Sequence, residues 1–189
     1  MSLLADQGRL KESQAVAEKS LTLPQPSSRV RMKLGEILEM QGLPGESQAQ
    51  YEKVISDNQL AGATTEMVEA FNTASAKLAA LFANQGINLD QALQLASAAK
   101  RYKPSDPFFS DTLGWIYVRK DRANNGLPHL EAAVSADPTN PVFRYHLGAA
   151  YERLGEYAKA RTELTRAVQG DTKFKGADDA RALLKAIGK

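Results

Sequence analysis

The sequence predicts an all-α fold, a right-handed superhelical solenoid of antiparallel helix pairs with a C-terminal capping helix. Three observations predict it: similar residues return every 34 positions, apolar residues recur at helical spacing within each period, and glycine or proline divides each period in two. A pair of short helices cannot bury its apolar faces alone. Successive pairs are therefore expected to stack on one another.

The period of 34 residues is present in both halves of the chain. The tetrapeptide Glu-Ser-Gln-Ala occurs at 12–15 and again at 46–49. In the second half the same offset relates Leu113 to Leu147, Gly114 to Gly148, Tyr117 to Tyr151, Leu130 to Leu164 and Ala133 to Ala167. Each period is thus expected to be one structural repeat.

The two halves are out of phase by 11 residues, because Gly42 and Gly155 are 113 positions apart. Eleven residues make about three helical turns, so an insertion of this length predicts a long helix, which fits the apolar spacing at 66–82. We expect a single solenoid over 1–189, and a larger parent protein of which this is a fragment, because the first repeat lacks its front half. The expected parts are a half repeat at 1–27, repeats at 28–61, 62–106 (extended), 107–140 and 141–174, and a capping helix at 175–189.

Local signals predict where the helices begin and end. Pro141 suits the first turn of a helix, Gly155 ends that helix, and 157–168 forms the second helix of the repeat. Asp106 is expected to be an N-cap, and Pro128 is expected in the first turn of its helix, where a missing N–H is tolerated.

Glycine recurs in the middle of the first helix of a repeat, at Gly35, Gly114 and Gly148. A glycine inside a helix costs about 1 kcal/mol relative to alanine. The repeated cost predicts close approach of the partner helix at these positions.

The two ends of the chain differ. Segment 176–187 has one apolar and one charged face, as a capping helix requires. The N-terminal end has no such cap, so we expect exposed apolar surface near Leu3, Leu4 and Ala17, and homo-oligomer formation through that end.

Composition and motifs argue against several classes of function. The 24 basic and 22 acidic residues are interleaved, so nucleic-acid binding is not expected, and no apolar run is long enough for membrane insertion. There is no cysteine, and the two histidines, His129 and His146, lack an obvious third metal ligand. We expect no catalytic residues, no metal, no cofactor and no enzymatic activity.

The pattern Leu-Gly-x-x-Tyr at 113–117 and 147–151, followed by spaced alanines, resembles the tetratricopeptide repeat (TPR). Ser110 and Arg144 replace the usual first-helix aromatic of that family. More narrowly, the succession of 111–121, 127–138 and 145–164 is similar to the C-terminal repeats of bacterial TPR lipoproteins of the PEP-CTERM and exosortase system. That similarity implies a periplasmic or outer-membrane-anchored parent acting in envelope protein sorting or polysaccharide export; the sequence leaves a cytoplasmic location open.

The TPR resemblance implies that first helices line a concave groove that binds a protein or peptide segment. Aromatic and arginine side chains, which often dominate interface energy, occur on these helices. The residues expected in the groove are Phe108, Asp111, Trp115, Arg119, Tyr145, His146 and Arg153, together with Lys33 and Lys77.

Two alternatives stay open from the sequence. Trp115, the only tryptophan, is expected either to pack against the next repeat with one edge exposed or to be a free-standing anchor, and the first is favoured. The chain as a whole is expected to be a non-catalytic interaction scaffold. It could instead serve as a structural spacer or oligomerisation module, or as an accessory domain of an enzyme.

Overall fold

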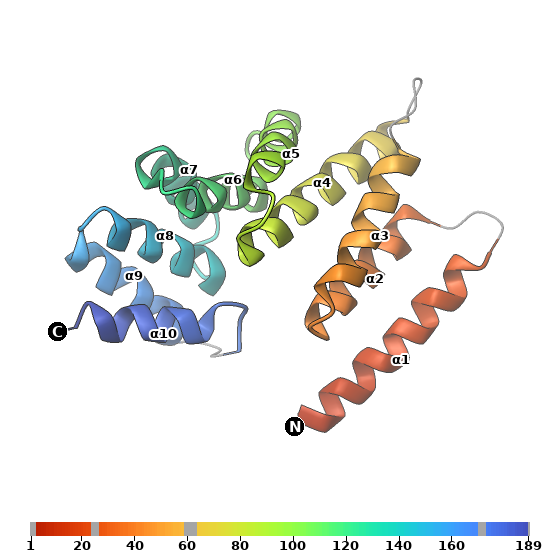
Figure 1. Cartoon of the computed structure of the whole chain (residues 1–189), viewed down its shortest axis with the longest axis horizontal. Coiled ribbons are helices and arrows are strands. Elements are labelled where there is room, and N and C mark those ends of the chain that lie inside the picture. The colour runs from red at the N-terminus through yellow and green to blue at the C-terminus, as the bar shows by residue number, and fades with distance from the viewer. Residues whose placement is uncertain (1–2, 24–26, 59–63, 170–172, 189) are drawn as a thin grey trace. The chain divides into compact units, whose positions relative to one another are not determined.

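The computed structural model describes residues 3–23, 27–58, 64–169 and 173–188, with side chains from residue 8 onward. Within these ranges the chain forms ten α-helices and no strand (Figure 1), which confirms the all-α prediction. The helices are α1 (Leu3–Leu21), α2 (Ser28–Met40), α3 (Pro44–Asp57), α4 (Thr65–Gln85), α5 (Leu89–Tyr102), α6 (Pro107–Arg119), α7 (Ala123–Ala136), α8 (Pro141–Arg153), α9 (Tyr157–Gln169) and α10 (Ala177–Ala186).

The chain divides into two compact units, Met1–Leu81 (unit 1) and Phe82–Lys189 (unit 2). The division falls inside α4, the long helix predicted from the apolar spacing at 66–82. In unit 1, α2 packs against α1 and α3, and Val54 of α3 forms a buried cluster with Ala70 and Ala74 of α4. In unit 2, successive helices from α5 to α10 pack against one another.

Capping explains where the first helices of unit 2 begin. Pro107 opens α6, and the Asp106 carboxylate accepts hydrogen bonds from the backbone N–H groups of Phe108 at 2.9 Å and Phe109 at 3.3 Å. Pro141 opens α8 in the same way, as predicted. Gly155 follows the end of α8 with φ of +75°, a conformation that glycine adopts without strain.

The mid-helix glycines lie where two helices approach closely, which confirms the prediction made for them. A Cβ atom on Gly114 would stand 2.6 Å from Leu130 Cγ and 2.9 Å from the carbonyl oxygen of Gly126. The equivalent atom on Gly148 would stand 2.7 Å from Leu164 Cγ. In unit 1, Gly35 meets the Tyr51 ring in the same manner.

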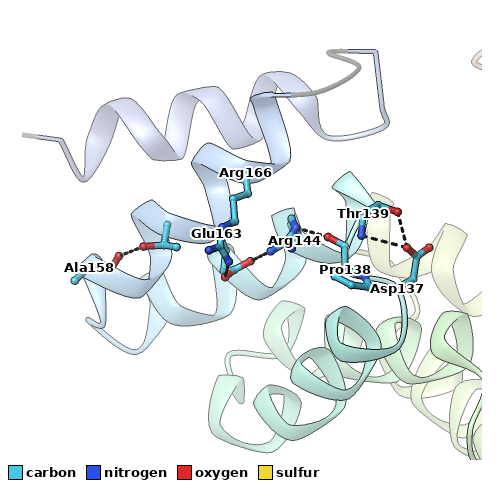
Figure 2. Close-up of polar contacts among 8 residues, drawn as sticks. Asp137, Pro138, Thr139, Arg144, Ala158, Glu163 and Arg166 are labelled. Carbon is cyan, nitrogen blue, oxygen red and sulfur yellow. Dashed lines mark hydrogen bonds and ion pairs between the residues drawn. The ribbon is translucent and has the colours of Figure 1, made fainter.

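Polar contacts replace the usual aromatic at Arg144. Figure 2 shows its side chain reaching both the turn before α8 and the neighbouring helix α9. Nε donates a hydrogen bond to the Pro138 carbonyl oxygen at 2.7 Å, and the guanidinium forms an ion pair with Glu163, in which both side chains are 13% exposed. Glu163 also pairs with Arg166, one turn further along α9. The preceding turn is held by Asp137, whose carboxylate accepts from the Thr139 backbone N–H and hydroxyl.

Two sequence predictions are wrong in detail. Pro128 is the sixth residue of α7 rather than part of its first turn, and it leaves the carbonyl of exposed Asn124 without its helical donor. Ala17 is buried, at 7% exposure, because it packs against Leu34 and Leu38 of α2. The side chains of Leu3 and Leu4 lie outside the described residues, but α1 does expose Val16, at 68%.

Candidate functional site

The first helices of unit 2 line a concave pocket of about 530 Å³. They are α6, α8 and α10, which lie in succession within the unit (Figure 1), with α8 in contact with both of the others. The lining residues fall into three groups by helix: Trp115, Val118 and Arg119 on α6; Tyr145, Ala149, Glu152 and Arg153 on α8; and Asp179, Ala182, Leu183 and Ala186 on α10. We call this site the unit 2 groove.

Helix α10 was not expected to form a wall of the groove. It continues the 34-residue register as one more first helix, with Leu183 in the position of Ala149 and Trp115, and Asp179 in the position of Tyr145. Because α6 packs beside α8 and α8 packs beside α10, the third helix continues the surface formed by the first two. The offset was visible in the sequence and would have identified this wall.

Trp115 packs against the neighbouring repeat, as the favoured alternative predicted, but at 6% exposure it has little of the exposed edge that was expected. Its ring stacks on that of His146 with centroids 4.2 Å apart and 9° between the planes. Its Nε1–H donates to Asn84 Oδ1 at 3.2 Å, and the Tyr145 ring lies at 5.6 Å. The indole therefore forms part of the groove floor and does not project as a free anchor.

Asp111 and His146, predicted as groove residues, contact each other in the interior. His146 Nδ1 lies 3.0 Å from Oδ1 and 2.9 Å from Oδ2 of Asp111. The residues are 6% and 3% exposed, and neither lines the groove. Their assignment as partner contacts is corrected: α6 and α8 turn these side chains toward each other, and the pair supports the floor from beneath.

Tyr145 lines the groove but is 7% exposed, because the segment before α10 covers part of it. Phe174 packs at 6.4 Å between ring centroids, and a Cβ on Gly176 would lie 2.6 Å from Tyr145 Cε1. Burial raises the pKa of Tyr145 to about 12; the Asp179 carboxylate adds to this rise, and Arg119 opposes it. Its hydroxyl has no hydrogen-bond partner among the described residues.

The arginines of the groove are the accessible part of the predicted site. The Arg119 guanidinium lies 5.7 Å from the centroid of the Trp115 ring, within range of a cation–π interaction, and donates to the Asn84 carbonyl at 3.4 Å. The Arg153 side chain is 55% exposed and forms an ion pair with Asp121 at 2.6 Å. Phe108 is half-buried beside Phe109 and does not line the groove.

The two predicted lysines belong to unit 1, where they share one carboxylate. Lys77 Nζ lies 2.6 Å from Glu36 Oε1, and Lys33 Nζ lies 2.9 Å from Oε2. Burial raises the pKa of Glu36, but the hydrogen bonds and charges of the two lysines outweigh burial and hold that pKa below its ordinary value. These residues line a separate concavity of about 500 Å³ with Arg29, Val30, Met32 and Thr73.

Two general properties bear on what the site can do. Among the described residues, no helix is both long enough and apolar enough to cross a membrane. No group of three or more histidine, aspartate or glutamate side chains in the described part of the chain could hold a metal ion.

Comparison with known proteins identifies the class of fold. Residues 117–175 match the tetratricopeptide repeat family model, and no curated protein matches the chain in sequence. Among solved structures, the TPR protein TTC0263 of Thermus thermophilus is 16% identical over 97% of this chain and 93% of that chain, with a TM-score of 0.67. YrrB, a TPR protein, is 16% identical over 95% and 87%, with a TM-score of 0.54.

Part of a larger protein has a similar fold. A chain of the APC/C hetero-tetramer Cut9–Hcn1 is 16% identical over 96% of this chain but only 34% of its own length, with a TM-score of 0.75. These identities show the fold alone. Together with the match at 117–175, they support a TPR protein and confirm the predicted fold class of a TPR-like solenoid of helix pairs.

Proposed function

We propose that the chain is a non-catalytic interaction scaffold that holds a segment of a partner protein in the unit 2 groove. The observation that carries this proposal is the convergence of three successive first helices on one concavity with an aromatic and aliphatic floor and two arginines at its side. Aromatic and arginine side chains are common carriers of binding energy. YrrB, which has the same fold, is described as a TPR protein with an unusual peptide-binding site, which supports a peptide as the class of ligand.

The geometry gives little support to catalysis. The Asp111–His146 pair resembles the base and orienting acid of a catalytic site. Both side chains are less than one tenth exposed, however, and the Trp115 ring is stacked on the imidazole. A reacting atom needs a position about 3 Å from the base, so burial of the pair favours a structural role.

Photo-cross-linking in cells of the source organism tests the proposal. A benzoylphenylalanine at Ala182, an exposed groove residue of α10, is expected to capture a partner protein. The matched control is the same substitution at Ala158, an exposed alanine of α9 outside the groove lining. Equal adducts at both positions, or no adduct at Ala182, would count against the groove.

We further propose that the parent acts in the bacterial envelope, in protein sorting or polysaccharide export. The support is the similarity of 111–121, 127–138 and 145–164 to lipoprotein repeats of the PEP-CTERM and exosortase system. Sorting or export genes beside the coding sequence are the expected finding. A neighbourhood without them would remove this proposal and leave the groove proposal intact.

A second candidate function is an oligomerisation module or spacer. In unit 1, α1 and α2 line an apolar concavity of about 650 Å³, at whose sides Val16 and Met40 are 68% and 71% exposed. Burying such surface favours association. If this function holds, light scattering will show a concentration-dependent dimer that Val16→Glu with Met40→Glu converts to monomer. Tyr157→Glu, which changes an exposed aromatic of unit 2, is the control and should leave the dimer unchanged.

A further inference from the structure

We infer that the unit 2 groove selects a segment with a basic residue and an acidic residue four positions apart and an apolar residue between them. This inference rests on the proposal that the groove holds a segment of a partner protein. It adds the chemistry of that segment and the direction in which its charges are arranged.

The apolar requirement comes from the floor. Trp115, Ala149 and Leu183 occupy the same register position on α6, α8 and α10, and all three line the groove. Alanine between two large side chains leaves a depression in the middle of the floor. One aliphatic side chain of the partner fits there, because apolar area is then removed from water on both sides.

The acidic requirement comes from the end of the groove formed by the last turns of α6 and α8. Arg153 lies there, eight residues beyond Tyr145, whereas Arg119 of α6 directs its guanidinium back over the Trp115 ring. Arg153 is held by Asp121, whose side chain is 79% exposed, and by Glu152 at 3.8 Å. Exposed ion pairs contribute little stability, so a carboxylate of the partner can replace Asp121 at modest cost.

The basic requirement comes from the opposite end. Asp179 is exposed in the first turn of α10, next to Tyr145, whose hydroxyl has no hydrogen-bond partner among the described residues. An ammonium group at this end meets the carboxylate of Asp179 and can donate to the Tyr145 hydroxyl oxygen. The groove lining thus separates two charges along the helices: Arg153, with Glu152 beside it, at one end and Asp179 at the other.

The spacing of the charges follows from helix geometry. Eight residues along an α-helix advance about 12 Å, and an extended peptide covers about 3.3 Å per residue. Arg153 and Asp179 also lie on neighbouring helices, whose axes are about 8–10 Å apart. Four positions of an extended partner advance about 13 Å, and its long lysine and glutamate side chains cover the remaining distance. The middle position then stands over Ala149.

The test uses synthetic peptides and the fluorescence of Trp115, which reports on the groove because it is the only tryptophan. The probe is acetyl-Gly-Lys-Ser-Leu-Ser-Glu-Gly-amide. Matched peptides replace glutamate by lysine, lysine by glutamate, or leucine by serine. We expect the probe to change Trp115 emission and to bind at least about tenfold more tightly than each of the three.

Reversing the charge at Arg153 tests which end of the groove binds the acidic residue of the peptide. Arg153→Glu is expected to weaken the probe and to strengthen the peptide in which lysine replaces glutamate. Arg101→Glu, an equal change at an exposed residue of α5, should leave both affinities unchanged. Circular dichroism confirms that each variant is folded.

Two peptide results would overturn the inference: equal affinities for all four peptides, or no change in Trp115 emission with any peptide at millimolar concentration. A dimer that forms through Arg153 would also overturn it, because a second copy of the chain would then occupy the unit 2 groove. None of these decides whether the groove binds a partner. The proposal that the groove binds a partner is tested separately, by the cross-links from Ala182.

Discussion

At the scale of single residues, glycine sets how closely paired helices approach. Gly114 lies against Leu130 and against the backbone of Gly126, and Gly148 lies against Leu164 at the same register position. Neither site has room for a methyl group. Packing therefore offsets the loss of helix propensity at both positions.

Substituting Gly114→Ala should destabilise unit 2 by about 1–3 kcal/mol, the usual cost of overpacking, although alanine is the better helix former. The added Cβ would meet a backbone oxygen at 2.9 Å, which cannot move aside as a side chain can. Urea unfolding measures the change. Gly8→Ala is the control, because nothing lies within 4 Å of its Cβ position, and it should be neutral or stabilising. Equal effects of the two substitutions would contradict the close-approach account.

The buried Asp111–His146 pair should matter to the groove floor as well as to stability. Asp111→Leu leaves the imidazole without its carboxylate, and a buried polar group that loses its hydrogen-bond partner costs about 1–3 kcal/mol. Because His146 is stacked on Trp115, the emission of Trp115 is also expected to change. Asp121→Asn, at a highly exposed carboxylate, should cost less than about 1 kcal/mol. A stability loss below about 1 kcal/mol for Asp111→Leu would contradict a structural role for the pair.

At the scale of elements, Glu36 joins α2 to α4 through Lys77 and carries a pH dependence. Its folded-state pKa is held below the ordinary value, so its contribution to stability is present above the unfolded-state pKa and is lost as pH falls through the folded value. Glu36→Gln should therefore lower the free energy of unfolding at pH 7, by about 1 kcal/mol or less for a partly exposed pair. The difference should shrink below about pH 4. Glu46→Gln, at an exposed residue of α3, is the control, and a difference that grows with acidity would refute the assignment.

The position of α10 depends on Gly176, which precedes it with φ of +99° and lies against the Tyr145 ring. Gly176→Ala combines backbone strain with a steric clash. We expect faster hydrogen exchange in α10 and greater exposure of Tyr145, with α6 and α7 unaffected. Unchanged protection of α10 would show that its packing on α9 is sufficient to hold it.

The helix starts and the glycine contacts could be predicted from the sequence, because they depend on short-range rules. Asp106 before a proline predicts a cap whatever the tertiary structure. The residues of the groove were harder to predict than the helix starts. A small rotation of α6 relative to α8 decides whether a side chain beside the buried face points into the groove or between the helices. That rotation puts His146 and Asp111 inside, and no short-range pattern encodes it.

At the scale of the whole molecule, each unit has its own buried apolar residues, such as Leu34, Leu38 and Val54 in unit 1 and Ile116, Leu130 and Leu164 in unit 2. In repeat proteins, stability is roughly a sum of local contributions and nearest-neighbour contacts. Trp115 reports on unit 2, whereas far-ultraviolet circular dichroism reports on the helices of both units.

Urea unfolding followed by the two signals should therefore give different midpoints. Gly35→Ala, which forces a Cβ to within 2.5 Å of the Tyr51 ring, should shift the circular dichroism transition and leave the Trp115 transition nearly in place. Gly114→Ala is the matched change in unit 2 and should move the Trp115 transition. Coincident shifts in both signals would show that the units unfold together.

The shared register also determines how such a protein can change its length. A second copy of 107–140 inserted after Asn140 would carry its own contact between Gly114 and Leu130 inside the repeat, and would end in the same N-cap before Pro141. Tandem duplication would thus add one more wall to the groove without redesign of the interior. In this architecture, binding surface grows in whole steps of 34 residues, and point substitutions in the groove then give each new wall its own specificity.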